Sequence, residues 1–167
     1  MDAGTETRSN AAIDTADNEL VIMRVFDAPR ALVFRSWVDK AHALRWSGPR
    51  DYPAVHIEGD VRPGGNWRTC LRAADGSRDL WQSGVYREVV EPERLVFTFA
   101  WDQEDGSRGP ETLITIDFVE QGGKTKMIFR QAPFNTKANR DGHSQGWNSA
   151  FDRLAEALAT LSTERSR

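Results

Sequence analysis

The sequence predicts an α+β fold in which a curved, seven-stranded antiparallel sheet surrounds one long C-terminal helix. Segments with β-type patterns follow one another from Ala54 to Gln131, and only turn-length connections separate them. None of these connections is long enough for the crossover helices that parallel strands require. The strongest amphipathic helical pattern comes last in the chain, so its apolar side has to be buried against that sheet.

The first elements are a strand and two short helices. Residues Glu19–Phe26 are mostly apolar or β-branched, which predicts a strand. Asp27 and Pro29 favour the start of a helix directly after it. A second short helix is predicted over Lys40–Trp46, and the segment SGP at 47–49 ends it.

Six further strands are predicted from alternating apolar positions and from the turn residues between them. They are Val55–Asp60, Trp67–Arg72, Leu80–Val90, Leu95–Trp101, Thr112–Glu120 and Thr125–Gln131. The connections have hairpin length and turn composition, as in RPGG at 62–65 and QGG at 121–123. Consecutive strands should therefore pair antiparallel, as a curved meander.

The last element is a helix of about 20 residues, which begins near Thr136 or, after a break at Gly142, near His143. Its apolar residues recur at spacings of three and four: Trp147, Ala150, Phe151, Leu154, Leu158 and Leu161. The predicted organisation is a flexible leader at 1–18, one domain at 19–161 and a frayed polar tail at 162–167.

Composition excludes several classes of protein. The chain has 167 residues, a net charge of −3 and no basic cluster, so nucleic acid is not an expected partner. Cys70 is the single cysteine, which rules out an internal disulfide. No apolar run approaches the length of a membrane span, and the polar N-terminus lacks the apolar segment of a secretory signal. We therefore expect a cytoplasmic protein.

Five segments carry a family resemblance. They are VFDAPRALVFRSWVD at 25–39, DVRPGG at 60–65, GVYREV at 84–89, PERL at 92–95 and GW at 146–147 before the apolar helix. In this order they resemble the SRPBCC superfamily of START and birch-pollen-allergen proteins, and most closely its branch named for the activator of the 90-kDa heat-shock protein ATPase. The resemblance runs from about Glu19 to Leu161 and implies the helix-grip fold. It does not fix an activity, because lipid carriers, cyclases and co-chaperone domains share this fold.

The strand faces assigned to the inside combine large aromatic residues with a few isolated polar ones. A mostly apolar cavity with a few fixed polar groups is typical of a small-molecule site. The resemblance also places Trp46 near the cavity mouth, either as a lid or as a packing residue. The candidate ligand-binding residues are Trp46, Trp67, Thr69, Tyr86, Phe97, Phe99, Met127, Phe129, Gln131, Trp147 and Phe151. The competing interpretation is that these side chains only fill a core.

No motif predicts a metal, a cofactor or a catalytic residue. His42, His56 and His143 lack metal-ligand spacing, and Cys70 has no partner cysteine. The sequence contains no G-x-S-x-G motif, and the glycines at 64–65 are not followed by the residues of a phosphate loop.

Three functional hypotheses follow. The first is a binding protein for a hydrophobic or aromatic small molecule, held between the sheet and the C-terminal helix. The second is a protein-interaction module with a chaperone partner, similar to the heat-shock ATPase activator. The third is a cofactor-free cyclase, dehydratase or hydrolase that uses Tyr86 or a histidine as acid or base. The sequence leaves a homodimer open.

Overall fold

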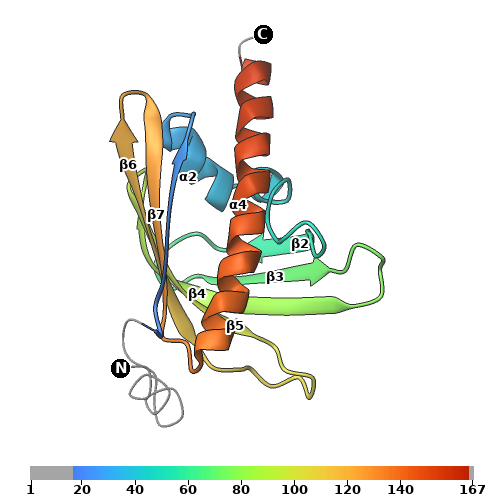
Figure 1. Cartoon of the computed structure of the whole chain (residues 1–167). Helices are drawn as coiled ribbons and strands as arrows, with labels where there is room; N and C mark the ends of the chain where they lie inside the picture. The colour runs from blue at the N-terminus through green and yellow to red at the C-terminus, as the bar shows by residue number, and fades with distance from the viewer. Residues whose placement is uncertain (1–16, 166–167) are drawn as a thin grey trace, which may run out of the picture.

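The computed structural model describes residues 17–165, in which one sheet and three helices form the fold. The sheet has seven antiparallel strands in the order β1-β7-β6-β5-β4-β3-β2, and α4 crosses its concave face (Figure 1). The strands are β1 Leu20–Phe26, β2 Ala54–Gly59, β3 Asn66–Arg72, β4 Asp79–Val90, β5 Arg94–Trp101, β6 Thr112–Gln121 and β7 Lys124–Ala132. The helices are α2 Arg30–Val38, α3 Lys40–Ala43 and α4 Lys137–Arg165. This architecture confirms the predicted fold class.

Each strand begins and ends within one residue of its predicted bounds. Turn residues explain this agreement, because they stop a strand for steric reasons. At the β6–β7 hairpin, Gly122 and Gly123 have φ angles of 58° and 86°, a region that residues with a side chain rarely adopt. Most of the predicted leader at 1–18 lies outside the described residues.

The predicted bounds of the second short helix and of the C-terminal helix need correction. The helix predicted over Lys40–Trp46 ends at Ala43 and continues only as a turn. In contrast, α4 has 29 residues, passes Gly142 without a break, and continues to Arg165, into the predicted frayed tail. Thr136 caps its start, because the N–H of Asn139 donates to Thr136 Oγ1 at 3.0 Å. A single glycine inside a helix costs only about 1 kcal/mol, so packing of the long helix outweighs it.

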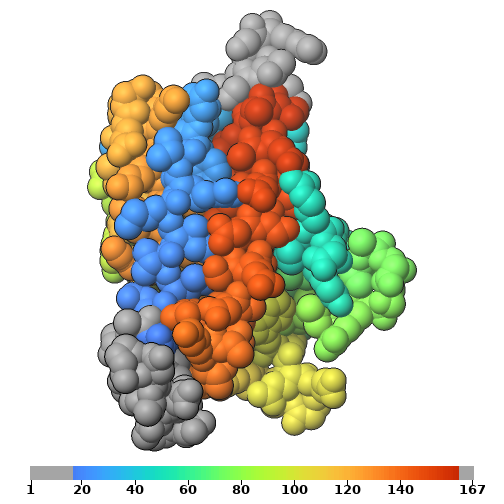
Figure 2. Space-filling model, viewed as in Figure 1, coloured from blue at the N-terminus to red at the C-terminus, as the bar shows by residue number. Residues whose placement is uncertain are grey.

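The core fills only one half of the sheet. Buried side chains from β1, β5, β6 and β7 pack against α2 and the C-terminal part of α4. Phe151, Leu154 and Leu158 supply the α4 side of this core, as the apolar spacing predicted. Figure 2 shows the outer face of α4 on the surface, between β1 in blue and the cyan segment that follows α3.

A glycine shapes the other half of the sheet. The pairing of β4 with β5 passes from Ser83–Ala100 to Tyr86–Phe97 around Gly84. Here the N–H of Val85 donates to Thr98 Oγ1 at 2.8 Å, and the indole N–H of Trp67 donates to the Thr98 carbonyl oxygen at 3.1 Å. A Cβ at position 84 would overlap that oxygen and lie 2.6 Å from Trp67 Nε1. Glycine is therefore required for both contacts.

We predict that Gly84→Ala lowers the free energy of unfolding by about 3 kcal/mol, because backbone and indole must move apart to admit one methyl group. Gly142→Ala is the control, since nothing lies within 4 Å of a Cβ there, and helix propensity should raise stability by about 0.5–1 kcal/mol. Urea denaturation of the two variants checks both. Equal stabilities would contradict the close approach at Gly84, and a loss at Gly142 would contradict the unbroken helix.

Candidate functional site

A cavity of about 480 Å³ lies over the half of the sheet that the core leaves open. Its walls come from β2, β3, β4 and β5, from the N-terminal part of α4, and from the segment between α2 and β2. None of its lining residues belongs to β1, β6 or β7. The volume is within the range usual for small-molecule sites.

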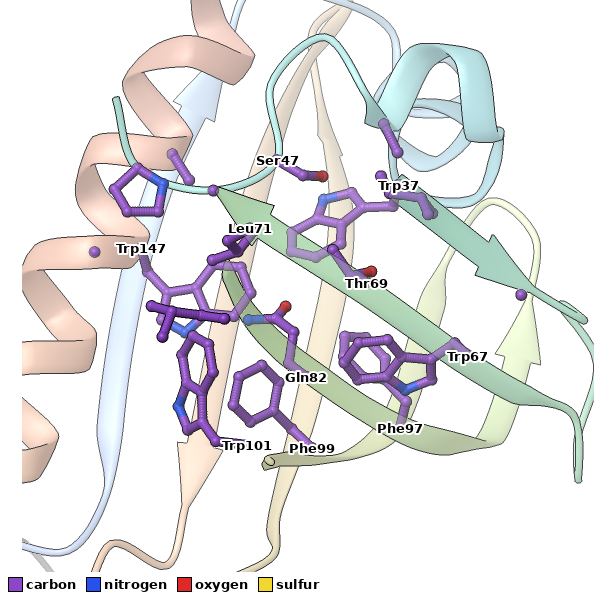
Figure 3. Close-up of a pocket in the computed structure, with 18 of the residues that line it drawn as sticks. Trp37, Ser47, Trp67, Thr69, Leu71, Gln82, Phe97, Phe99, Trp101 and Trp147 are labelled. Atoms are coloured by element: carbon purple, nitrogen blue, oxygen red, sulfur yellow. The ribbon is translucent and has the colours of Figure 1, made fainter. Parts of the chain in front are cut away.

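Tryptophan dominates the wall of this cavity. Five of the six tryptophans in the chain line it: Trp37, Trp46, Trp67, Trp101 and Trp147. Figure 3 shows Trp67, Trp101 and Trp147 with Phe97 and Phe99 around one space, contributed by strands β3 and β5 and by α4. The sixth, Trp81, lies outside the lining, because residues on β4 alternate between the two faces of the sheet.

The structure divides the candidate ligand-binding residues into two groups. Those in the cavity wall are Trp46, Trp67, Thr69, Tyr86, Phe97, Phe99 and Trp147. Those away from it, with no exposed surface, are Met127, Phe129, Gln131 and Phe151. The second group faces inward as predicted but packs in the filled half of the core. Strand alternation gives the face of a residue and not its position across the sheet, so it does not separate Met127, Phe129 and Gln131 from the wall. Helical spacing likewise indicates only that Phe151 is on the buried side of α4.

Sequence reasoning also missed several lining residues. Trp101 shares the inward face of β5 with Phe97 and Phe99, and Gln82 shares the inward face of β4 with Tyr86. Strand alternation could therefore have identified both Trp101 and Gln82 as lining residues. Trp37 had no such signal, because it stands at the end of α2, and only the packing of that helix brings it to the cavity.

Hydrogen bonds fix the Trp147 indole. Its N–H donates to Gln131 Oε1 at 2.9 Å, and Gln131 Nε2 donates in turn to Thr112 Oγ1 at 2.9 Å. Thr112 Oγ1 donates to the carbonyl oxygen of Phe99 at 3.3 Å. Gln131 thus uses both ends of its amide inside the protein. It positions Trp147 and does not face the cavity.

Trp46 is a packing residue with one side in the cavity wall. It is only 1% exposed, and its indole N–H donates to the carbonyl oxygen of Ser36 at 2.9 Å. Its ring packs edge to face on Trp37, with 4.7 Å between the ring centroids. These contacts favour the packing interpretation over a mobile lid.

Several polar side chains in the wall form no hydrogen bond with another residue in the described part of the chain. They are those of Ser47, Tyr52, Thr69, Gln82 and Tyr86. Figure 3 shows the amide of Gln82 between the aromatic rings. Burial raises the pKa of Tyr86 to about 12, so its hydroxyl keeps its proton over the physiological range. The indole N–H of Trp37 is a further buried donor for which residues 17–165 provide no acceptor.

His143 holds Trp101 in place. The indole N–H of Trp101 donates to His143 Nε2 at 2.9 Å, and His143 Nδ1 lies 2.9 Å from the carbonyl oxygen of Asn139. Because a carbonyl only accepts, Nδ1 carries the proton and Nε2 accepts. Burial lowers the pKa of His143, which favours this neutral form, although the Asn139 contact opposes the shift. Its basic nitrogen is already used.

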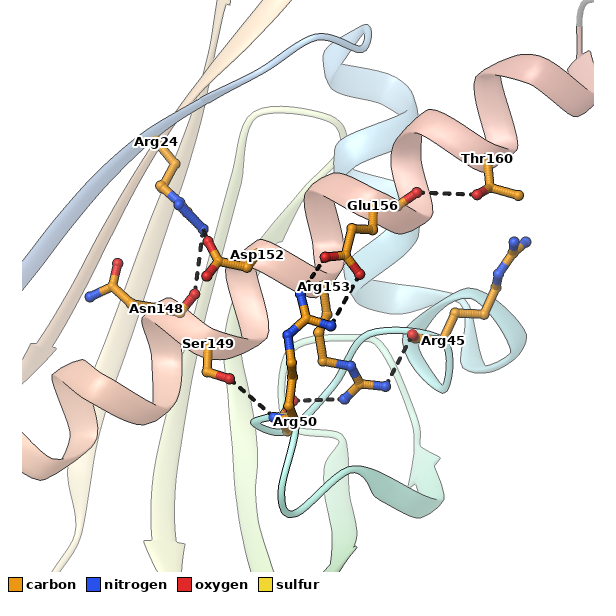
Figure 4. Close-up of polar contacts among 10 residues, drawn as sticks. Arg24, Arg45, Arg50, Asn148, Ser149, Asp152, Arg153, Glu156 and Thr160 are labelled. Atoms are coloured by element: carbon orange, nitrogen blue, oxygen red, sulfur yellow. Dashed lines mark hydrogen bonds and ion pairs between the residues drawn. The ribbon is translucent and has the colours of Figure 1, made fainter. Parts of the chain in front are cut away.

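Arginines on α4 and on the neighbouring loop fix the rim (Figure 4). Arg153 Nη1 donates to the carbonyl oxygens of Ser47 and Gly48 at 2.8 and 2.7 Å. Its Nη2 donates to the carbonyl oxygen of Arg45 at 3.2 Å. The N–H of Arg50 donates to Ser149 Oγ, and its guanidinium pairs with Glu156. The loop that contributes Ser47 and Gly48 to the cavity is thereby attached to α4.

Charged groups lie only at the outer parts of the wall. Lys40 and Glu58 are the charged lining residues, both exposed, and Glu58 lies 3.2 Å from His56 Nε2. Within residues 17–165, no three His, Cys, Asp or Glu side chains come together in an arrangement suited to a metal ion. The described part of the chain also has no helix with the length and apolar character needed to cross a membrane.

We predict that Arg153→Ala lowers the free energy of unfolding by about 2 kcal/mol, because three carbonyls lose a charged donor. Arg153→Lys should recover only part of this, since an ammonium cannot reproduce the spread of the guanidinium. Arg50→Ala is the control, because its ion pair is exposed to solvent and its loss should change the stability much less. Urea denaturation gives the ranking, and an equal loss at Arg50 and Arg153 would disprove it.

A second prediction concerns pH. His143 has a folded-state pKa below its ordinary value of 6.5, so the unfolded chain binds the proton first as the pH falls. The stability that the neutral His143 provides is therefore complete well above pH 6.5 and decreases below it. Urea midpoints at about pH 7.5 and about pH 5.5 should fall further for the wild type than for His143→Gln. If both proteins lose the same stability between the two pH values, the interpretation that His143 is neutral and buried in the folded protein is wrong.

Comparison with known proteins gives one family and many similar folds. The model of the family described as "Activator of Hsp90 ATPase homolog 1-like protein" matches residues 27–159. A protein of Chromobacterium violaceum has 22% sequence identity and a TM-score of 0.77, covering 84% of this chain and 96% of that chain. The AHSA1 protein of Silicibacter pomeroyi has 26% identity and a TM-score of 0.76, covering 86% and 99%. A Rhizobium leguminosarum protein has 27% identity and a TM-score of 0.73, covering 85% and 94%. No curated protein matches the sequence.

Proposed function

Because this chain belongs to the activator of Hsp90 ATPase homolog 1-like family, which supports a ligand-binding or activator-like domain, we propose that it is a binding protein for an apolar small molecule. The family match confirms the resemblance identified in the sequence. We place the ligand in the cavity between α4 and strands β2 to β5, within the single domain at 19–161.

The cavity itself carries this proposal. Protein interiors are normally close-packed, and an open apolar space of about 480 Å³ leaves many wall atoms without packing partners. Here the surrounding side chains are held by hydrogen bonds, such as those of Trp147 and Trp101, that keep them from collapsing inward. A ligand would supply the missing contacts.

The geometry favours binding over catalysis. The Tyr86 hydroxyl stays protonated, so it can donate a hydrogen bond but does not serve as a base at neutral pH. The basic nitrogen of His143 accepts from Trp101. If the protein is a cofactor-free enzyme, a bound substrate should be recovered in altered form. If it is a binding protein, the ligand should be recovered unchanged. Native mass spectrometry of freshly purified protein, followed by extraction of any bound molecule, separates the two.

We predict that Trp147→Leu weakens binding of the neutral dye N-phenyl-1-naphthylamine at least about tenfold, or 1.4 kcal/mol, because one wall of the cavity is lost. Trp81→Leu is the matched control, since Trp81 does not line the cavity, and it should leave the dye affinity unchanged. Fluorescence titration measures both, and circular dichroism establishes that each variant is folded.

A second variant, which fills the cavity, tests the site without removing the packing and the hydrogen bond of Trp147. Gln82→Trp should fill the cavity and weaken dye binding about as much as Trp147→Leu does. It removes no side-chain hydrogen bond among the described residues. Equal dye affinities for the wild type and for Gln82→Trp would place the dye elsewhere and refute the proposed site.

A further inference from the structure

We infer that the cavity takes a neutral, planar ring compound whose carbonyl or similar acceptor receives the hydroxyl hydrogen of Tyr86. This inference rests on the proposed binding function and specifies its ligand class. It excludes fatty acyl chains and organic anions as preferred ligands.

The shape of the wall favours rings. The ring centroid of Trp67 lies 5.7 Å from that of Phe97, which it contacts edge to face, and 5.9 Å from that of Phe99. The ring centroids of Phe99 and Trp147 are 6.2 Å apart. These rings form a continuous aromatic surface along β3, β5 and α4, and Trp67 and Trp147 are only partly buried. Aromatic rings add a geometric preference for other rings to the energy of burial. An acyl chain would gain burial but not this preference.

The polar groups of the wall favour an acceptor. Tyr86 is largely buried, and its hydroxyl has no partner among the residues described. The hydroxyl keeps accessible surface at the cavity, unlike the indole N–H of Trp37, which also lacks an acceptor among the described residues but is fully buried. A ligand that covers the Tyr86 hydroxyl without offering an acceptor leaves a buried donor unsatisfied, so a ligand that brings an acceptor is bound more tightly than one that does not. The other unpaired polar side chains of the wall, on Ser47, Tyr52, Thr69 and Gln82, can donate or accept and impose no opposite demand.

The charges of the wall favour a neutral molecule. No arginine lines the cavity, Lys40 is exposed at its outer part, and the other charged lining residue is the carboxylate of Glu58. A carboxylate among the tryptophans would lose its hydration without gaining a cation, which is strongly unfavourable. A ketone has the same acceptor oxygen without this cost.

Four probes test the inference by isothermal titration calorimetry: 2-acetonaphthone, 2-ethylnaphthalene, 2-naphthoate and dodecanoate. The first three share a ring system and differ in the acceptor and the charge. We expect 2-acetonaphthone to bind most tightly, with 2-naphthoate weaker by at least about tenfold. In Tyr86→Phe the ketone should lose about fivefold in affinity, and 2-ethylnaphthalene should lose nothing.

Tyr86→Phe is expected to fold, because the hydroxyl that it removes has no partner in the described protein, and urea denaturation checks this. If Tyr86→Phe weakens both naphthalene probes equally, Tyr86 acts by packing alone and the inference is wrong. It is also wrong if dodecanoate binds best, or if the ketone and the hydrocarbon bind alike, although the binding function then stands. If none of the four probes binds, the proposed function itself fails.

Discussion

The width of the sheet governs this structure. Seven strands about 4.8 Å apart span roughly 29 Å, whereas a helix with its side chains is about 10–12 Å across. One long helix therefore cannot cover the whole concave face. With the help of α2 it covers β1, β7 and β6, and the core is complete there. Over β4, β3 and β2 the cover is a loop and the short helix α3, and a cavity remains.

The tryptophans keep that uncovered half from collapsing. Indoles are large and rigid, and four of the five in the wall donate their N–H to a fixed acceptor in another part of the fold. Three of these acceptors, on Ser36, Thr98 and Gln131, lie outside the cavity wall, and the fourth, His143, is part of the wall. In each case the polar edge of the indole is satisfied within the protein. Trp37 differs, because its N–H has no acceptor among the described residues. A wall organised before binding loses little entropy when a ligand arrives.

The strands, the antiparallel pairing of consecutive strands from β2 to β7 and most of the aromatic wall could be predicted from the sequence, because alternation and turn residues act locally. The pairing of β1 with β7 could not, because it joins the first and the last strand of the chain. The sequence also did not contain the boundary between the filled and the open half. Phe129 and Phe97 have the same pattern on their strands and both belong to the core, yet only Phe97 also lines the cavity. Phe129 instead packs against Trp147 and Phe151 of α4. The roles of Gln131 and His143 were also hidden, because each depends on a partner distant in the sequence. The break predicted at Gly142 is absent, because tertiary packing of α4 overrides the low helix propensity of one glycine.

The attachment of the rim to α4 has a thermodynamic consequence. Trp147 in the wall and Arg153 at the rim belong to one rigid helix, so the docking of α4 and the shape of the cavity are linked properties. By this linkage an occupant that binds only the folded form stabilises the whole domain, by about 2.7 kcal/mol at a hundred times its dissociation constant. If the proposed binding function holds, the melting temperature of a preparation rises with the fraction of its molecules that carry a ligand.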